Sequence, residues 1–407
     1  MTKGLTSSAL GPEARPYPPH ADPASMPLEH CLPRALPREP GTLMLGIFQP
    51  NQSWSFWPTT ASTETSWTYP YNRDVVRLAE SIGMHFAFPA GRWKGIAGDS
   101  IDWRGASFDT VTLTAGLLEA TSRITLLTTI HTNVFNPVVA AKIGADLDQI
   151  GQGRWGLNIV SGWGVQEFGS MGIPLLNHAD RYRYTSEWLK IIRKLWETGE
   201  CTHSGEYFTI SEAVARPRPM QSPRPLIVNA GQSNTGLRFA AKEADYVFSG
   251  AANAERYRRL CAEDGVDGGI IGTIKIVVRE TSLGANELAS EIADHADRGA
   301  IRGMMIASGG DTPESADEKL ATREQVRQRA IDGAVIGSPE EVARELTDRA
   351  VASSLDGFCL TFFDYQRDLT LFAERVVPPM REMLLERGVR LRLLSDEPSP
   401  SRASATS

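Results

Sequence analysis

Short apolar segments alternate with amphipathic segments along most of this chain. The amphipathic segments repeat apolar residues every three to four positions, as helices do, and two begin at the capping signals Asn136-Pro137 and Ser338-Pro339-Glu340-Glu341. The apolar segments have the length of buried strands: TLMLGIF, HFAFP, RITLLTTI, GLNIV, PLIVNA, YVFSG, IIGTIKIVV and DGFCLTFFDY. Eight strand and helix repeats predict a TIM (β/α)8 barrel rather than an open doubly wound sheet.

The spacing of the repeats predicts one large domain with two inserted segments. Residues 41–390 hold all eight repeats, so we expect a single barrel domain there. Residues 1–40 carry many prolines and few large apolar side chains, which favours an extended or disordered arm, and residues 391–407 are expected to form a disordered tail. Residues 199–224 and 295–335 are too long for plain loops. We interpret both as insertions at the carboxyl face, and the second as a mobile lid.

Polar side chains gather at the ends of the third and fourth predicted strands. The third strand ends in Thr128, Thr129, His131, Thr132 and Asn133. The fourth strand contains Asn158 and is followed by Ser161, Gly162, Trp163, Gln166 and Glu167. In a barrel the carboxyl ends of the strands form the active site, so we expect these side chains to meet there. The alternative is that they satisfy loop backbone groups. His131 is a candidate general base, although most lone histidines are structural.

Three further segments have the composition of ligand-binding loops. Gly91-Arg92-Trp93-Lys94-Gly95 follows the second strand and offers cationic and aromatic surfaces for a planar ligand. The loop Ala230 to Gly236, with Gly231 and Ser233, joins a strand to a helix, where small residues and a helix start favour a phosphate. Arg181 and Tyr182 open a long helix, where an arginine opposes the helix dipole and suggests a nearby anion. A capped loop without ligand and solvated surface arginines are the alternatives.

One motif is misleading. Gly151 to Gly156 matches the G-x-G-x-x-G pattern of dinucleotide-binding folds. In those folds the glycines follow a strand and open a helix, whereas here they follow a helix and enter a strand. We therefore interpret the segment as a tight turn, and the chain has no evident nicotinamide-binding domain.

Composition narrows the classes of function. The net charge of −7 leaves no basic excess for binding nucleic acid, and no apolar run is long enough to span a membrane. The 4 cysteines form no C-x-x-C pair, and the 7 histidines form no metal-binding motif, so we expect free thiols in a reducing cytoplasm and no metal. A protein that acts on a small molecule in the cytoplasm fits best.

The combined motifs resemble the bacterial luciferase-like flavin monooxygenases, and within them most of all the pyrimidine monooxygenases, with the dimethylsulfone and alkanesulfonate enzymes more distant. Together the matching segments cover nearly everything from about residue 43 to residue 386: EATSRI, DQIGQGRWGLNIVSGW, RYRY, NAGQSNTG, VIGSPEEVA and LTFFDYQRDLTLFAERVVPPM. Each segment alone is weak evidence, whereas the combination is specific. The resemblance implies a TIM barrel that uses reduced FMN (FMNH2), supplied by a separate NAD(P)H:flavin reductase, and O2 as co-substrate.

The resemblance also assigns roles by position. Thr129 and Asn158 match positions beside the oxygen-reactive edge of the flavin, and with His131 they are the expected catalytic residues. The expected cofactor contacts are Gly91, Arg92, Asn158, Glu167, Arg181, Tyr182, Gly231 and Ser233. The family further implies a homo-oligomer.

This chain departs from the pyrimidine enzymes around the expected substrate mouth. It has His131 where they carry a small residue, and it adds Trp54, Trp57 and Trp67 between the first strand and the first helix. These differences favour a larger aromatic or heterocyclic substrate, with cleavage of a carbon–heteroatom bond. Two alternatives are a deazaflavin-dependent dehydrogenase on the same barrel and a non-catalytic flavin-binding protein.

Overall fold

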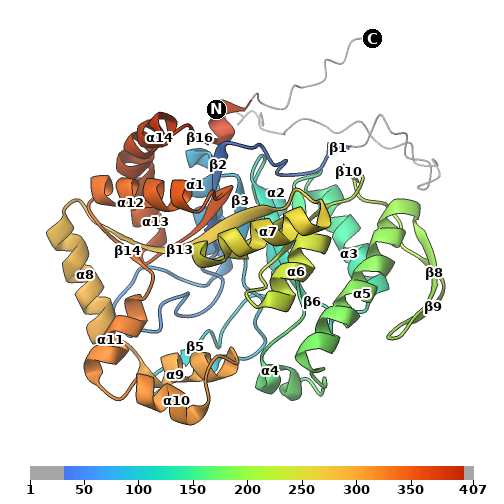
Figure 1. Ribbon diagram of the computed structural model, residues 1–407, viewed down its shortest axis with the longest axis horizontal. Coiled ribbons are helices and arrows are strands. Elements are labelled where there is room, and N and C mark those ends of the chain that lie inside the picture. The colour runs from blue at the N-terminus through green and yellow to red at the C-terminus, as the bar shows by residue number, and fades with distance from the viewer. Residues whose placement is uncertain (1–31, 398–407) are drawn as a thin grey trace, which may run out of the picture.

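Eight parallel strands close into a barrel in the computed structural model, which describes residues 32–397 (Figure 1). Each strand pairs with the next, and the last pairs with the first. The strands are β2 (Thr42–Phe48), β3 (Phe86–Phe88), β6 (Thr125–His131), β7 (Trp155–Val160), β11 (Leu226–Asn229), β12 (Tyr246–Ser249), β13 (Gly269–Val278) and β15 (Gly357–Phe362). The predicted TIM barrel and its eight strands are confirmed.

Helices surround the barrel, as Figure 1 shows. They are α1 (Tyr69–Ile82), α2 (Thr110–Ala120), α3 (Pro137–Ile150), α5 (His178–Thr198), α6 (Asn234–Glu243), α7 (Ala254–Asp264), α12 (Pro339–Ala352), α13 (Tyr365–Leu371) and α14 (Val377–Glu386). Both predicted capping signals form, because Asn136 accepts a hydrogen bond from the Val138 amide and Ser338 and Glu341 make a capping box. A π-helical segment, Phe372–Val376, joins α13 to α14.

The barrel interior is filled by aromatic and aliphatic side chains. The rings of Phe88 and Phe248 stack with centroids 4.5 Å apart. A Cβ on Gly46 would lie 2.4 Å from the ring of Phe86, so only glycine allows that ring its place in the barrel. This packed layer closes the barrel beneath its carboxyl end, which leaves that end for the site.

The segment between β13 and β15 forms the predicted insertion at the carboxyl end. It contains α8 (Ser282–Asp294), α9 (Arg298–Ala307), α10 (Pro313–Lys319), α11 (Arg323–Ile331) and β14 (Val335–Gly337). β14 pairs with the last residues of β13, and α9 and α10 lie at the same end of the barrel as α4 (Val165–Ser170) and the hairpin of β4 (Ile96–Ala97) and β5 (Asp102–Trp103) (Figure 1). The expectation for residues 295–335 is confirmed, whereas their mobility stays a prediction.

The expectation that residues 199–224 cover the same end is wrong. They form β8 (Glu200–Ser204), β9 (Thr209–Val214) and β10 (Gln221–Ser222). Gln221 donates from Nε2 to the carbonyl of Trp155, the first residue of β7, at 2.7 Å, so the segment ends at the amino end of the barrel. The reason is topological, because a segment that follows a barrel helix returns to where the next strand begins. The Gly151 to Gly156 segment lies between α3 and β7, which confirms the tight turn.

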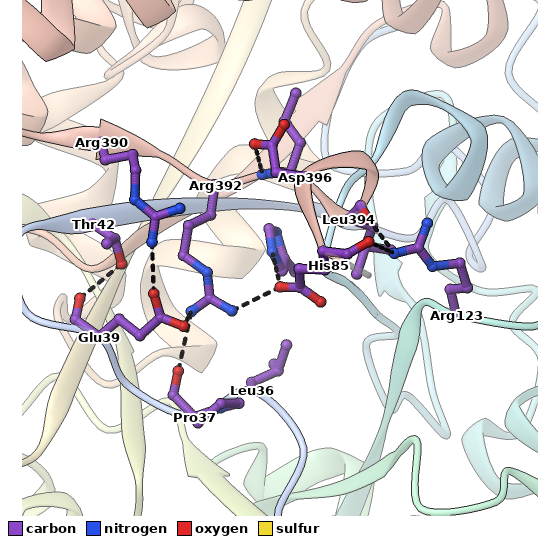
Figure 2. Close-up of polar contacts among 12 residues, drawn as sticks. Leu36, Pro37, Glu39, Thr42, His85, Arg123, Arg390, Arg392, Leu394 and Asp396 are labelled. Carbon is purple, nitrogen blue, oxygen red and sulfur yellow. Dashed lines mark hydrogen bonds and ion pairs between the residues drawn. The ribbon is translucent and has the colours of Figure 1, made fainter. Parts of the chain in front are cut away.

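The first and last described residues pack at the amino end of the barrel. The predicted arm covered residues 1–40, of which residues 1–31 lie outside the described residues. Residues 32–40 pack on the barrel instead, because β1 (Leu32–Pro33) pairs with β10 and Leu36 is buried. Residues 391–397 are not the expected loose tail, because β16 (Arg390–Leu391) pairs with β2 and Leu394 is buried. Figure 2 shows the polar contacts there: Arg392 donates to Glu397 at 2.7 Å and Arg390 donates to Glu39 at 2.8 Å. The polar composition of residues 391–407 as a whole led to the prediction of a tail, although Leu391, Leu393 and Leu394 are apolar.

Leu391→Ala should lower the free energy of unfolding by about 2–3 kcal/mol, since a buried leucine truncated to alanine leaves a cavity. Leu391 is 1% exposed, whereas Leu385 on α14 is 68% exposed. Leu385→Ala is therefore the matched control and should change the free energy little. Urea unfolding measures both variants, and equal values would show that residues 391–397 do not anchor to the barrel.

Candidate active site at the carboxyl end of the barrel

Polar side chains from four neighbouring strands converge on one cavity at the carboxyl end. The cavity has a volume of about 280 Å³, and Phe88 and Phe248 form part of its lining. Five predicted site residues also line it: Gly91, Arg92, Thr129, His131 and Asn158. They come from the ends of β3, β6 and β7, while Ala230 and Gln232 of the loop after β11 complete the wall. These residues therefore meet at the carboxyl ends of the barrel strands, as expected.

Asn158 and Thr129 form a hydrogen-bonded pair in this cavity. The two residues are register partners on β7 and β6, and Asn158 Nδ2 donates to Thr129 Oγ1 at 3.0 Å. Thr129 Oγ1 donates in turn to the carbonyl of Pro89 at 2.6 Å, which fixes the orientation of the amide. Asn158 is 1% exposed, and its Oδ1 has no hydrogen-bond partner among the described residues. A buried acceptor without a donor costs free energy, so this oxygen is set to accept from a bound molecule.

His131 lies beside this pair as a buried, neutral ring. A Cβ on Gly91 would be 3.1 Å from His131 Cε1, so the absence of a side chain at Gly91 lets the loop approach the ring. Burial, with a smaller contribution from the charge of Arg92, lowers the pKa of His131 to about 4. A ring with this pKa is a poor proton acceptor at neutral pH. We therefore expect His131 to shape the cavity and offer hydrogen bonds rather than act as a strong base.

This low pKa predicts acid sensitivity that depends on one residue. The pKa of His131 in the folded protein lies below the value of about 6.5 in the unfolded chain, so the unfolded state takes up the proton first as the pH falls. The free energy of unfolding therefore decreases as the pH falls from about 6.5 to about 4. Between pH 7 and pH 5 the loss is about 2 kcal/mol. His131→Gln should remove that part of the loss, as measured by urea unfolding at both pH values. His295→Gln, at an exposed histidine, should leave the loss unchanged.

Glu167 lies next to the cavity and organises the loop after β3. Its Oε1 accepts from the backbone N–H of Trp93 at 2.5 Å and of Lys94 at 3.3 Å, and Oε2 lies 3.2 Å from Arg92 Nη1. The guanidinium of Arg92 lies 4.6 Å from the ring centroid of Trp163, and burial lowers its pKa. Both oxygens of Glu167 are thus occupied by the protein. Its expected contact with the cofactor stays a prediction.

The other predicted cofactor contacts gather at the start of α6. Ser233 caps the helix by accepting from the Gly236 amide at 3.1 Å, and a Cβ on Gly231 would lie 2.8 Å from Gly236 Cα. A Cβ on Gly236 would lie 2.6 Å from the hydroxyl of Tyr182, so the two glycines and the tyrosine form a close-fitting group. Arg181 donates to the carbonyl of Gly162, and its Nε is buried without a partner. These residues adjoin the cavity through Ala230 and Gln232 rather than line it.

Two basic residues near the cavity were not predicted from the sequence. Arg104 lines the cavity, and Lys275 lines a second hollow that adjoins it. A signal for Lys275 was present, since a lysine within the apolar strand IIGTIKIVV is unusual. No comparable signal marks Arg104, which is buried by loops distant in sequence.

The three added tryptophans do not line this cavity, and their expected place around the substrate stays a prediction. Trp54, Trp57 and Trp67 line a separate hollow with Phe363. Trp57 is buried there, and its Nε1 donates to the carbonyl of Phe362 at 3.0 Å. The aromatic side chains at the cavity are instead Phe48, Phe56, Phe88, Trp163 and Phe248.

Residues 32–397 contain no group of three or more acidic, histidine or cysteine side chains arranged to hold a metal ion. Within the same range no helix has the length and hydrophobicity needed to cross a membrane.

Comparison with known proteins identifies the family. The family model described as luciferase-like monooxygenase matches residues 44–356. The chain is 32% identical over 360 residues to pyrimidine monooxygenase RutA of Acinetobacter baylyi, covering 83% of this chain and 95% of that protein. It is 31% identical over 353 residues to the same enzyme of Bradyrhizobium sp., covering 83% of this chain and 96% of the relative.

Solved structures share the fold. Riboflavin lyase (RcaE), crystallised with modified FMN and riboflavin, superposes with a TM-score of 0.74 at 21% identity, over 89% of this chain and 94% of that chain. The long-chain alkane monooxygenase LadA superposes with a TM-score of 0.72 at 20% identity, over 86% and 92% of the two chains. With the family model and the relatives above, these findings show that the chain is an enzyme of the luciferase-like, flavin-dependent monooxygenase family.

Proposed function

We propose that this enzyme is a two-component monooxygenase. It takes reduced FMN from a separate NAD(P)H:flavin reductase and uses O2 to oxygenate a small aromatic or heterocyclic molecule, with cleavage of a carbon–heteroatom bond. The observation that carries the proposal is the Asn158 and Thr129 pair, which presents a buried, unpartnered acceptor at the carboxyl end of the barrel. A buried acceptor without a donor requires an explanation, and a molecule bound in the cavity that Asn158 lines would supply the donor.

The residues present fit FMN. At the start of α6, Gly231 and Gly236 pack directly against each other, so no side chain separates the loop backbone from the helix start, which favours a phosphate. Arg181 adds positive charge, and its unpartnered Nε is a free donor. Tyr182 lies next to this group, and the loop runs directly into the cavity, where the planar ring system would lie near Asn158. We infer that Ser233, Arg181 and Tyr182 hold the phosphate end.

The protein would contribute orientation and dryness to the reaction. Reduced FMN, when bound, supplies the electrons that activate O2. Asn158 Oδ1 accepts a hydrogen bond from the bound molecules, while Thr129 keeps the amide from rotating. Neutral His131 and the aromatic lining add no charge beside the reacting atoms. Met304 of α9 adds an apolar side chain to the lining, which would limit the entry of water.

Flavin binding and oxygen consumption test the proposal. Purified protein is titrated anaerobically with photoreduced FMN, and binding is followed by flavin fluorescence. We expect saturable binding of one FMN per chain and, with an aromatic or heterocyclic substrate panel in air, oxygen consumption coupled to product. The absence of saturable binding would contradict the proposal.

The same measurement separates the alternatives. F420-dependent enzymes share the barrel, with TM-scores of 0.63 and 0.61, at 15% and 18% identity. A deazaflavin-dependent dehydrogenase would transfer hydride without consuming oxygen, and a non-catalytic flavin-binding protein would show no substrate-dependent turnover. An oxygen electrode therefore distinguishes all three functions.

A further inference from the structure

A second hollow adjoins the cavity that contains Asn158 and Thr129. It has a volume of about 470 Å³ and is lined by the middle of β13, the end of β15 and helix α9. Phe48, Phe56, Arg104, Thr273 and Met304 line both spaces, so the two lie side by side. A molecule bound in the second hollow would therefore lie next to the cavity where the flavin is proposed to lie.

Two cations face the second hollow without a carboxylate partner. Arg104 is 9% exposed, and its Nε donates to the carbonyl of Ser55 at 3.2 Å. Lys275 Nζ donates to the carbonyl of Ala330 at 3.2 Å and lies 5.0 Å from the ring centroid of Trp57. Neither side chain belongs to an ion pair among residues 32–397. Arg104 is buried and Lys275 is half-buried. Buried cations are normally paired, so the lack of an anion beside these two side chains requires an explanation.

The other charged groups of the lining do not neutralise these cations. Asp332 lines the hollow but pairs with Arg329 at 2.8 Å. Arg92, in the adjoining cavity, already pairs with Glu167. Desolvation, together with the charge of Arg92, lowers the pKa of Arg104 to about 9. Desolvation and the charge of Arg104 lower the pKa of Lys275 to about 8, against the weaker opposite effect of Asp332. Both remain mainly protonated at neutral pH.

The backbone at Arg104 is a second sign of function. Its φ of +62° lies in the left-handed region, where glycine or asparagine is the ordinary choice. Trp54 and Ser55, in the loop that contacts Arg104, also have positive φ angles of 62° and 45°. Its guanidinium is held over the rings of Trp103 and Phe56, at 4.1 Å and 4.6 Å from their centroids. Strain of this kind is retained where it places a side chain for binding or catalysis.

We propose that the second hollow is the substrate site and takes an aromatic carboxylate, whose carboxylate group pairs with Arg104 and Lys275 and whose ring extends toward Asn158. The planar fork of an arginine matches a carboxylate, and a lysine adds a point charge. Phe56, Trp103, Met304 and Met305 supply the apolar and aromatic surface for the ring. This inference rests on the proposed function and specifies its substrate class.

Binding of simple probes tests the inference. Benzoate and 2-naphthoate are titrated calorimetrically into the protein, with and without saturating FMN, and the neutral benzamide and 2-naphthamide serve as matched probes. We expect each acid to bind at least about 10-fold more tightly than its amide. Lys275→Met and Arg104→Met should each weaken binding of the acids by about 10-fold or more and leave binding of the amides unchanged. Lys275→Met should also leave FMN binding unchanged, because Lys275 does not line the cavity that contains Asn158.

Controls keep the test interpretable. Lys142→Met, at an exposed lysine on α3, should bind every probe as the wild type does. Lys275→Met removes a desolvated charge, so its thermal unfolding midpoint should not fall, and this variant carries the test if Arg104→Met does not fold. The inference would be overturned by equal affinity for acids and amides, or by no binding of either acid. It would also be overturned if Lys275→Met bound FMN more weakly but bound the acids as the wild type does. Failure of the wild type to bind FMN would instead contradict the proposed function, since the flavin-free titrations still report on the anion site.

Discussion

Asn158→Leu should lower turnover about 100-fold while the protein remains folded, because removal of one preorganised hydrogen-bonding group at a reacting centre costs about that much. Leucine keeps the shape of asparagine but removes the unpartnered Oδ1 and the Nδ2 donor to Thr129. The wild-type amide leaves a buried acceptor unsatisfied, so the variant should be at least as stable as the wild type. Steady-state oxygen consumption with reduced FMN gives kcat, and thermal unfolding gives stability.

A pair of neighbouring threonines provides the control for this result. Thr129→Val removes the hydroxyl that orients Asn158 and should also lower kcat strongly. Thr128 points to the other face of β6, where its Oγ1 accepts from Trp155 Nε1 at 2.9 Å. Thr128→Val should therefore cost about 1 kcal/mol of stability and leave kcat unchanged. A kcat for Asn158→Leu within about threefold of the wild-type value, with flavin binding intact, would show that the amide takes no part in the reaction.

The barrel and the centre of the site were predictable because both follow from local rules. Each barrel strand is a short apolar run between amphipathic helices, and eight repeats close only as a barrel. Thr129 and Asn158 both lie at strand ends of consecutive repeats, so the parallel arrangement alone makes them neighbours. The cofactor loop at Gly231 and Ser233 was predictable for the same reason, since it joins a strand to a helix.

The parts that were missed depend on contacts between distant segments. Arg104 is buried because its loop packs on the loop around Ser55, and the sequence near Arg104 contains nothing that indicates this contact. The position of residues 199–224 depends on the end of the barrel to which the preceding helix returns the chain, and the pattern of apolar residues does not indicate which end that is. Residues 391–397 look like a tail by composition, yet Leu391 and Leu394 find apolar surface on the barrel. The composition of a segment does not show whether another part of the chain offers it an apolar surface on which to pack.

Glu167→Gln should lower the free energy of unfolding by about 3–5 kcal/mol, because it removes one partner of a buried ion pair. The side chains of Arg92 and Glu167 are only 7% and 4% exposed, and their charged atoms are 3.2 Å apart. In the variant, Arg92 keeps its charge with no carboxylate beside it, and the amide of glutamine is a weaker acceptor for the backbone N–H groups of Trp93 and Lys94. Urea unfolding measures the loss, and FMN titration of the folded variant shows whether the 91–94 loop still supports binding.

The double variant Arg92→Met/Glu167→Gln decides whether charge or packing causes that loss. If the unpaired cation is responsible, the addition of Arg92→Met should restore much of the stability, since methionine keeps the apolar stem of arginine against Trp163 and removes the charge. A double variant as unstable as the sum of the two single variants would instead indicate that each side chain acts alone. FMN binding should stay weak in the double variant even when stability returns, because the loop contacts of the Glu167 carboxylate remain absent. Stability and cofactor binding would then separate, as expected of a positioning residue that acts on the cofactor through the loop it holds.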